Sequence, residues 1–259
     1  RVDENGLVNY AEIIGSEEVT DGDFSQEGAE KVTNGDFSVD SNWSNVGSDG
    51  WSIDTGTSTL NFTNASNYVF QGISTVSGKS YKVTLDIELD SGTIVAKSFS
   101  AQDVLTVTST GRQTVTGYFQ EIDSNANFGF VASGSANGKI HSVSVKEVGA
   151  AWTVPAGWAI ADNEATCSSG NGSLTQDVSA EIGKQYKVTF DISTFTSGTL
   201  HTDLGGASSQ TTTTTGSKTF YFTATSTGLL RFYGGAFRGS IGNISVKEVT
   251  RDNVPRIDY

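Results

Sequence analysis

The feature that most constrains this chain is an internal repeat, in which two long stretches carry nearly the same pattern. Residues 78–87, read as Gly-Lys-Ser-Tyr-Lys-Val-Thr-Leu-Asp-Ile, return at 183–192 as Gly-Lys-Gln-Tyr-Lys-Val-Thr-Phe-Asp-Ile. Residues 142–148 return in the same way at 243–249. A repeat spaced by the length of a small domain predicts two copies of one fold rather than a solenoid. Duplication suits a binding or building module, because a second copy adds avidity.

Each copy is predicted to be all-β. Apolar and polar residues alternate over 81–87 and again over 186–192, which is typical of half-buried antiparallel strands. No window of helical periodicity extends beyond about two turns. We therefore expect two tandem antiparallel β-sandwich domains of jelly-roll type with short terminal scaffold segments. The expected boundaries are an acidic N-terminal scaffold or linker segment at 1–31, modules at 32–148 and 149–249, and a C-terminal scaffold segment at 250–259.

Charge and composition disfavour several classes of function. The 259 residues carry a net charge of −13, which does not favour a nucleic-acid partner because phosphates need Lys and Arg to neutralise them. No apolar run approaches the ~20 residues that span a membrane, so we expect no membrane insertion. The single Cys cannot form an internal disulfide. There is no Met, so we expect a processed product or a piece of a longer chain.

The start of the first module resembles a known family. Residues 32–38 read Val-Thr-Asn-Gly-Asp-Phe-Ser and are followed by Trp43, Gly50 and Trp51. This run resembles the opening of carbohydrate-binding modules of the galactose-binding-like jelly-roll type. The resemblance implies that the motif begins the first strand and that Phe37 enters the core. A partial copy at 19–25 precedes it and is interpreted as a duplicated or decayed start.

The two ends of the chain carry a second resemblance. Residues 1–8 and 253–259 resemble segments of bacteriophage tail-fibre and related virion structural proteins. The arrangement implies domains inserted into a fibre scaffold, so we expect residues 1–14 and 250–259 to approach each other in space. The implied partners are other virion proteins, and the implied location is the virion surface, outside the cell. A homotrimer is also implied, because fibre proteins usually form trimers.

Candidate glycan contacts follow from the chemistry of sugars. The apolar face of a sugar ring stacks on aromatic side chains, and its hydroxyls bond amides and charged groups. In the first module the candidates are Trp43, which lies in a polar loop, together with Asn67 and Tyr68. In the second module they are Tyr233 and Arg238, which flank a glycine-rich segment.

One metal site is also considered. Related modules often hold a structural calcium bound by oxygen atoms, and the resemblance makes Asp36 a candidate ligand. The acidic pair that the family carries before its last strand is replaced in both copies by His, Ser, Gly or Asn. We therefore expect no cofactor apart from this calcium candidate.

No catalytic constellation emerges from the sequence. The two histidines, His141 and His201, occupy different positions in the two copies and are interpreted as ordinary surface residues. A glycosidase would need two facing carboxylates in a cleft, whereas Asp86 and Glu88 alternate along the polar face of a strand. We predict a non-catalytic virion structural protein, a tail fibre or surface decoration, whose modules adhere to host-surface glycans. The alternative is a pair of tandem carbohydrate-binding modules from a secreted bacterial polysaccharide-degrading enzyme.

Overall fold

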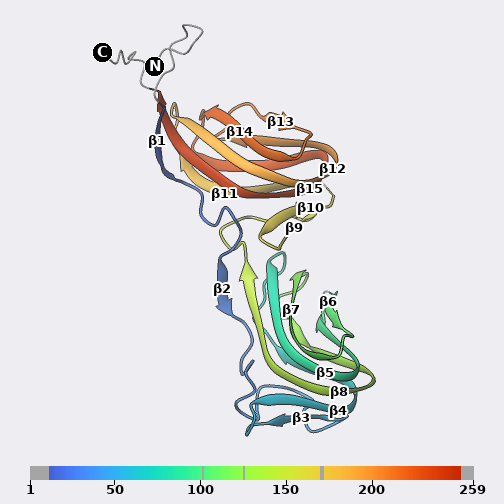
Figure 1. Ribbon diagram of the computed structural model, residues 1–259. Helices are drawn as coiled ribbons and strands as arrows, with labels where there is room; N and C mark the ends of the chain where they lie inside the picture. Colours follow the sequence, from blue (N-terminus) through green and yellow to red (C-terminus); the bar gives the residue numbers. More distant parts are fainter. Residues whose placement is uncertain (1–11, 101, 125, 170–171, 252–259) are drawn as a thin grey trace, which may run out of the picture. The chain divides into compact units, whose positions relative to one another are not determined.

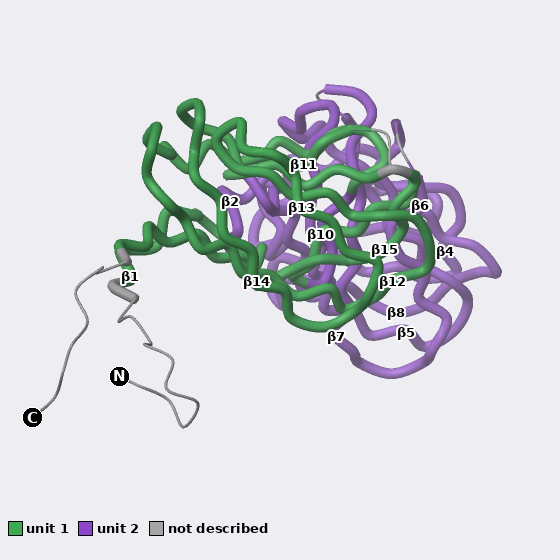
Figure 2. Tube along the Cα trace, turned by 90° about the horizontal axis from the view of Figure 1, so that it is seen from above, with its two compact units in different colours: residues 1–25, 151–158, 163–259 green, residues 26–150, 159–162 purple. Residues whose placement is uncertain are grey.

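The computed structural model describes residues 12–100, 102–124, 126–169 and 172–251 of the chain. Within these ranges every regular element is a β-strand, and the strands form antiparallel sheets (Figure 1). The all-β prediction is confirmed. None of the described residues belongs to a helix long and apolar enough to cross a membrane. Contacts divide the chain into unit 1, drawn from 1–25, 151–158 and 163–259, and unit 2, drawn from 26–150 and 159–162 (Figure 2).

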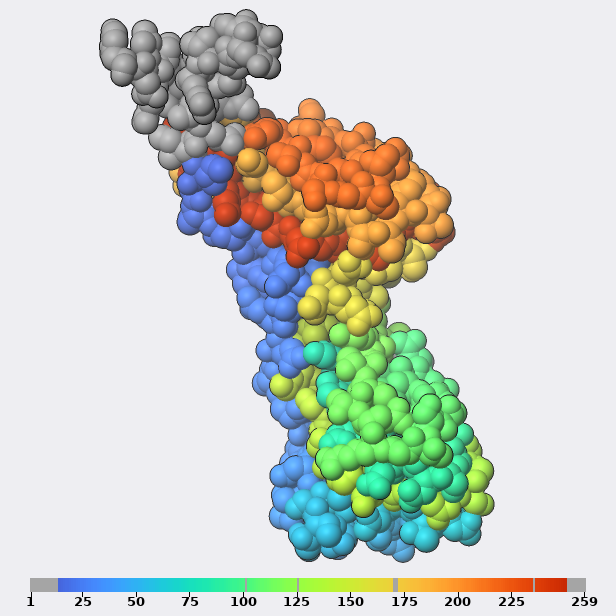
Figure 3. Space-filling model, viewed as in Figure 1, coloured from blue at the N-terminus to red at the C-terminus, as the bar shows by residue number. Residues whose placement is uncertain are grey.

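Unit 2 is formed by a seven-stranded sheet whose strands are β2 (Glu27–Glu30), β3 (Trp51–Asp54), β4 (Thr59–Gly72), β5 (Ser80–Ser98), β6 (Gln102–Val107), β7 (Gly111–Gln120) and β8 (Asn127–Val148). β5 pairs with β7 over its first half and with β6 over its second half, and β8 lies alongside throughout. β6 and β7, coloured green, form part of the visible surface of this unit (Figure 3).

The long strands of unit 2 bend, so that their two halves form two layers. The bend in β5 lies at Gly92, where φ is 83° and an added Cβ would lie 2.6 Å from the Cα of Ala136. On either side of it, alternate residues such as Leu85 and Ile94 are fully buried. The two layers therefore enclose one core, as the β-sandwich prediction requires. Phe37 is fully buried in that core, as expected, but residues 32–38 follow β2 without forming a strand, so the expectation that the motif begins the first strand is wrong.

Unit 1 repeats this plan with the strands β1 (Glu12–Glu17), β10 (Glu164–Cys167), β11 (Ser173–Ala180), β12 (Gln185–Leu204), β13 (Gln210–Thr212), β14 (Gly216–Thr223) and β15 (Gly228–Arg251). The short β9 (Trp158–Ala161) is the eighth strand of the same sheet, although residues 159–161 are grouped with unit 2. β12 takes the place of β5, and β15 takes the place of β8. The bend of β12 lies at Gly198, where φ is 82° and an added Cβ would lie 2.1 Å from the backbone oxygen of Ala236.

The N-terminal segment belongs to unit 1 and supplies its opening strand. β1 pairs antiparallel with the end of β15. The carboxylate of Glu17 accepts hydrogen bonds from the backbone N–H of Val246 at 2.7 Å and from Ser245 Oγ at 2.6 Å. The side-chain amide of Gln176 pairs with the backbone of Thr20, accepting from its N–H and donating to its oxygen, each at 2.7 Å.

The aromatic ring of this opening segment enters the core of unit 1. Phe24 is 1% exposed, and its ring centroid lies 5.3 Å from that of Trp152. The Nε1 of Trp152 in turn donates to the backbone oxygen of Asp21 at 3.0 Å. The motif at 32–38 makes the same contacts in unit 2, where the rings of Phe37 and Trp43 lie 5.5 Å apart.

The chain therefore divides differently from the boundaries expected from its sequence. Residues 12–25 do not form part of a separate scaffold segment, because their strand, side-chain and ring contacts lie with residues 152–251. Of the two interpretations of 19–25, the duplicated start agrees with the structure and the decayed start is wrong, since these residues open unit 1 as 32–38 open unit 2. In the sequence, unit 2 is thus inserted between the opening of unit 1 and its remaining strands.

The expected approach of the two chain ends is confirmed for the described residues. Ile13 lies opposite Thr250 and Ile14 lies opposite Val249 in the β1–β15 pair. Residues 1–11 and 252–259, on which the rest of that expectation falls, lie outside the described residues.

Candidate functional site

Trp43, the expected surface aromatic of the first module, is buried. It is 7% exposed, and its ring centroid lies 5.5 Å from that of Phe37 and 5.7 Å from that of Phe130. Its Nε1 donates to the backbone oxygen of Asn34 at 3.1 Å. The polar loop around it suggests exposure, but the indole packs inward between Phe37, which is near in sequence, and Phe130, which comes from β8. The expectation of a glycan contact at Trp43 is therefore corrected to a core role.

Asn67 and Tyr68 are neighbours in β4 and lie at the surface. Tyr68 is 38% exposed. Asn67 adopts a left-handed conformation with φ of 63°, and its Nδ2 donates to Asp49 Oδ2 at 3.0 Å. The backbone oxygen of Tyr68 accepts a hydrogen bond from Asn45 Nδ2 at 3.2 Å. These two bonds hold the backbone from which the Tyr68 ring projects.

Three aromatic side chains gather where Tyr68 reaches the surface, and we call them the aromatic face of unit 2. The ring of Tyr68 lies 5.7 Å from that of Phe70 and 5.4 Å from that of Phe99, and Phe70 lies 6.0 Å from Phe99. Phe70 and Phe99 are each half-buried. Aromatic pairs at such separations are mutually stabilising, so the three rings form one continuous apolar surface.

A buried carboxylate holds the turn that carries Phe99. Glu121 is 1% exposed and accepts hydrogen bonds from the hydroxyl of Ser98 at 3.0 Å and from that of Ser100. The backbone N–H of Phe99 donates to the oxygen of Asn127 at 2.9 Å. Hydroxyls from both sides of Phe99 are thus tied to one acid, which positions its ring beside Tyr68.

Charged groups lie beside the aromatic face on the same sheet. Phe70 lies opposite Gly129, and Gly129 lies opposite Lys97, so these residues share one face. The Nζ of Lys97 lies 2.8 Å from Asp103 Oδ1. An apolar platform bordered by an ion pair offers both kinds of contact that a sugar ring requires.

Unit 1 carries a different set of side chains at the corresponding positions. In unit 2, Gly129 of β8 lies between Phe70 of β4 and Lys97 of β5. In unit 1, Arg231 of β15 takes the place of Gly129, and it lies between Thr175 of β11 and Asp203 of β12. Two residues farther along β15, the ring of Tyr233 stacks on that of His201 in β12, with centroids 5.1 Å apart and an interplanar angle of 18°. The corresponding face of unit 1 is therefore polar and charged where that of unit 2 is aromatic.

An ion pair fixes the charged part of this face. Arg231 Nε lies 2.7 Å from Asp203 Oδ1; the Asp203 side chain is 2% exposed, and that of Arg231 is 44% exposed. The hydrogen bond to Asp203 raises the pKa of Arg231, so the guanidinium stays charged. One side of the guanidinium is anchored by a buried acid while the rest of it reaches solvent.

The second predicted contact of this module, Arg238, lies apart from Tyr233. Arg238 is exposed and lies opposite Ser197, whereas Tyr233 lies opposite His201. The irregular pairing around Thr199 separates the two positions along the strands. The structure therefore brings Tyr233 together with His201 and Arg231, and it does not bring Tyr233 together with Arg238.

Asp36, the calcium candidate, makes local hydrogen bonds. Its Oδ1 accepts from the backbone N–H of Ser38 at 3.3 Å and from Ser38 Oγ at 3.0 Å. The described residues contain no group of three His, Cys, Asp or Glu side chains that could hold a metal ion. The Asp36 carboxylate thus stabilises its own turn, and calcium binding by oxygen atoms stays a prediction.

The acidic residues singled out in the sequence are paired with bases. A hydrogen bond from Arg112 lowers the pKa of Asp86, whose Oδ2 lies 2.7 Å from the guanidinium. A hydrogen bond from Lys139, followed by a weaker one from His141, lowers the pKa of Glu88. A general acid needs a raised pKa at neutral pH, and these two carboxyls are shifted in the opposite direction.

Sequence reasoning missed three of the residues that form these faces. His201 was interpreted as an ordinary surface residue, and neither Phe99 nor Asp203 was singled out. Tyr233 and His201 are brought together only by the β12–β15 register, which the local sequence does not encode. The signal for Phe99 is weak, because it lies in a turn after a strand rather than within an alternating pattern.

Comparisons with known proteins give only distant likenesses. No family model matches the chain, and no curated protein matches it. Among solved structures, the N-terminal CBM22-1-CBM22-2 tandem domain of Xyn10C from Paenibacillus barcinonensis shares 8% identity with a TM-score of 0.35, covering 86% of this chain and 98% of that one. The ANXUR1 extracellular domain from Arabidopsis thaliana shares 7% identity with a TM-score of 0.30, covering 76% and 86%. At these values neither likeness assigns a function.

Proposed function

We propose that this chain is a non-catalytic glycan-binding structural protein and that the aromatic face of unit 2 is its principal contact with sugar. The observation that carries the proposal is the cluster of Tyr68, Phe70 and Phe99, with ring centroids 5.4 to 6.0 Å apart. Tyr68, at 38% exposed, is a large apolar ring that the fold leaves in contact with water. Such a platform is complementary to the apolar face of a pyranose ring.

The construction of this face supports a binding role. The turn of Phe99 is anchored by Glu121, and the backbone at Tyr68 is held by Asn45, so little side-chain freedom is lost on binding. The ion pair of Lys97 and Asp103 beside the rings offers hydrogen-bond partners for hydroxyl groups. Asn67, whose amide is bonded to Asp49, lies next to Tyr68 and completes the polar border.

The proposed setting is the surface of a bacteriophage particle, where the chain would contact other virion proteins and face cell-surface glycans. The support is the resemblance of residues 1–8 and 253–259 to tail-fibre segments, together with the β1–β15 pair that brings residues 12–14 beside 249–251. Weak single contacts are enough in such a setting, because many copies act together. Blocking of phage adsorption by the purified chain would test this setting, and unchanged adsorption at saturating protein would contradict it.

Affinity electrophoresis against a panel of neutral polysaccharides tests the glycan site. Tyr68→Ala should weaken retardation of the chain by the bound polysaccharide about tenfold or more, because it removes the exposed ring. Ile122→Ala is the matched control, since Ile122 is an exposed apolar residue of the same unit at 60% exposure. Equal retardation of the two variants and the parent chain would refute the aromatic face as the site. Release of reducing ends from any retained polysaccharide would refute the non-catalytic assignment.

A further inference from the structure

Tyr233 and Arg231 lie on the same side of β15, on the face of unit 1 that solvent reaches. They are separated by Phe232, whose side chain is fully buried on the opposite side of the strand. The side chain of Arg231 is 44% exposed, and Tyr233 is half-buried. Alternate residues of a strand lie about 7 Å apart, so an aromatic ring and a cation stand side by side at the surface.

The neighbouring strand β11 leaves one side of the Tyr233 ring uncovered. On the β12 side the His201 ring stacks on it, with centroids 5.1 Å apart. On the β11 side the residue opposite Tyr233 is Ser173, whose side chain is too short to cover an aromatic ring. Thr175, the next residue of β11 on this face, lies opposite Arg231 and carries a second hydroxyl. The ring therefore keeps one face for a ligand, above two hydroxyl groups.

The guanidinium of Arg231 presents its outer end to solvent. Its Nε donates to Asp203 Oδ1 at 2.7 Å, and the Asp203 side chain is 2% exposed. Within the described part of the chain, neither Nη atom of Arg231 has a hydrogen-bond partner. A ligand therefore meets the cationic end of the ion pair, with the acid buried beneath it. Paired N–H donors without an acceptor are complementary to a carboxylate, which only accepts.

The same position in unit 2 leaves no room for a charged side chain. There Gly129 takes the place of Arg231, and an added Cβ would lie 2.0 Å from the backbone oxygen of Val69. The aromatic face of unit 2 is thus built without a cation at this place, whereas unit 1 has one beside its ring. The two faces therefore suit different saccharides, neutral on unit 2 and acidic on unit 1.

The charge of the chain does not exclude an acidic ligand from this face. The net charge is −13, but residues 149–249, which supply β11, β12 and β15, hold six Lys and Arg against seven Asp and Glu. Asp177 is the exposed acid of β11, and its Oδ1 accepts a hydrogen bond from the backbone N–H of Ser179 at 2.9 Å. It lies opposite Leu229, on the far side of Arg231 from Tyr233. A ligand placed between Tyr233 and Arg231 therefore stays away from this carboxylate.

We infer that this face of unit 1 binds a sugar acid. The carboxylate of a uronic acid residue accepts hydrogen bonds from the Nη atoms of Arg231, and its pyranose ring lies against the open side of Tyr233. The hydroxyls of Ser173 and Thr175 lie beneath it, in position for the hydroxyl groups of the sugar. The inference extends the proposed function and rests on it only in taking a saccharide as the ligand.

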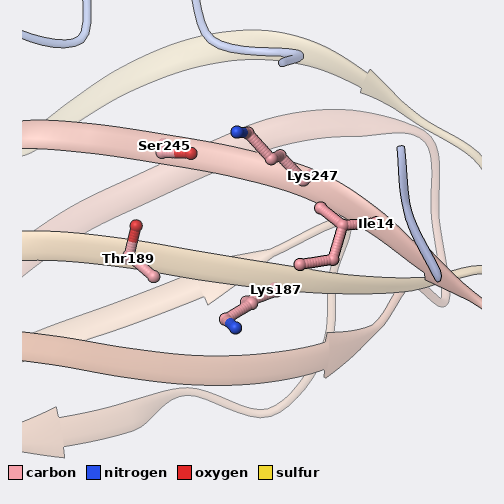
Figure 4. Close-up of a pocket in the computed structure, with 5 residues that line it drawn as sticks. All are labelled: Ile14, Lys187, Thr189, Ser245 and Lys247. Atoms are coloured by element: carbon pink, nitrogen blue, oxygen red, sulfur yellow. The ribbon is translucent and has the colours of Figure 1, made fainter. Parts of the chain in front are cut away.

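A second gathering of positive charge in unit 1 offers an acidic polymer a competing contact. Figure 4 shows Lys187 and Lys247 beside a cavity of about 200 Å³. Among the described residues that line this cavity none is aromatic, and the hydroxyl of Ser245 already donates to Glu17. This place can attract an acidic polymer by charge, but it has no ring on which a sugar stacks. Lys247→Gln therefore serves as the control for attraction by charge alone.

Affinity electrophoresis with polygalacturonate and alginate, each compared with its methyl ester, tests the carboxylate contact. At least one of the two acid forms should retard the parent chain about tenfold more strongly than its ester, which keeps the sugar and removes the charge. Arg231→Lys keeps a cation beside Asp203 but loses the paired donors, and should weaken retardation by that acid form about tenfold. Arg238→Lys, the same change at another exposed arginine of unit 1, should keep the parental value.

A second variant tests the ring. Tyr233→Leu removes the stacking surface and should also weaken retardation by the acid form, while thermal unfolding checks that both variants of the site remain folded. Neutral polysaccharides run on the same gels report on Tyr68 and the aromatic face, so failure of the proposed function and failure of this inference are separate results. Equal retardation by both acid forms and their esters would overturn the inference. Parental retardation of a folded Tyr233→Leu would overturn it too, as would a loss in Lys247→Gln equal to that in Arg231→Lys.

Discussion

Truncation of Phe24 tests whether the first segment of the chain completes the unit whose other strands follow residue 151. Phe24 is 1% exposed and packs against Trp152 at 5.3 Å. Burial of a Phe side chain contributes about 1.5–3 kcal/mol. The cavity and the lost ring contact raise the cost of Phe24→Ala to about 3–5 kcal/mol. With a urea slope of about 2 kcal/mol per molar, the unfolding midpoint of unit 1 should fall by about 2 M.

Hydrogen exchange followed by mass spectrometry at increasing urea separates the two units. Peptides from β12 report on unit 1, and peptides from β5 report on unit 2. Phe24→Ala should lower the midpoint of β12 protection and leave that of β5 unchanged. Phe37→Ala is the mirror control, because the fully buried Phe37 opens unit 2. Loss of β5 protection in Phe24→Ala, with β12 intact, would refute the assignment of the first segment to unit 1.

Two further predictions concern charged groups. Arg231→Ala leaves the buried carboxylate of Asp203 unpaired and should lower the stability of unit 1 by about 2–3 kcal/mol, less than for a fully buried pair because Arg231 is half-exposed. Adding Asp203→Asn should restore part of the melting temperature measured by thermal unfolding, and no recovery would contradict the pairing. Hydrogen bonds from Lys82 and then Lys146 lower the pKa of Glu27 below its ordinary value of 4.5, so its contribution to stability is present above pH 4.5 and is lost as the pH falls through the lowered pKa. Glu27→Gln should flatten this part of an acid titration of the urea midpoint of unit 2, and an unchanged slope would count against the ion pairs of Glu27 with Lys82 and Lys146.

The strands and the core residue Phe37 could be predicted because their signal is local. Alternation of apolar and polar residues over 81–87 and 186–192 follows from the two-residue period of a strand. Phe37 lies within a motif whose copy at 19–25 was also visible in the sequence. What no local pattern states is that the first copy pairs with β15, more than two hundred residues later. The sequence shows two opening motifs before the first copy and none before the second. Only the strand pairing shows that 19–25 belongs to unit 1 and 32–38 to unit 2.

The site was harder to predict for the same reason. Trp43 stands among polar neighbours, yet its indole is enclosed by Phe130, which comes from a distant strand. Tyr68 lies at the surface, as a glycan contact requires, but its partner Phe99 reaches it only through the fold.

The insertion of unit 2 into unit 1 sets an order for folding during synthesis. As the chain leaves the ribosome, all seven strands of unit 2, the inserted or guest domain, have emerged before β10 to β15 of unit 1, the host domain, are made. The host's leading strand must therefore wait, with Phe24 still in water, until Trp152 and the last strand arrive. The guest matures first and the host closes last, so a stalled or shortened product would retain the guest and lose the host.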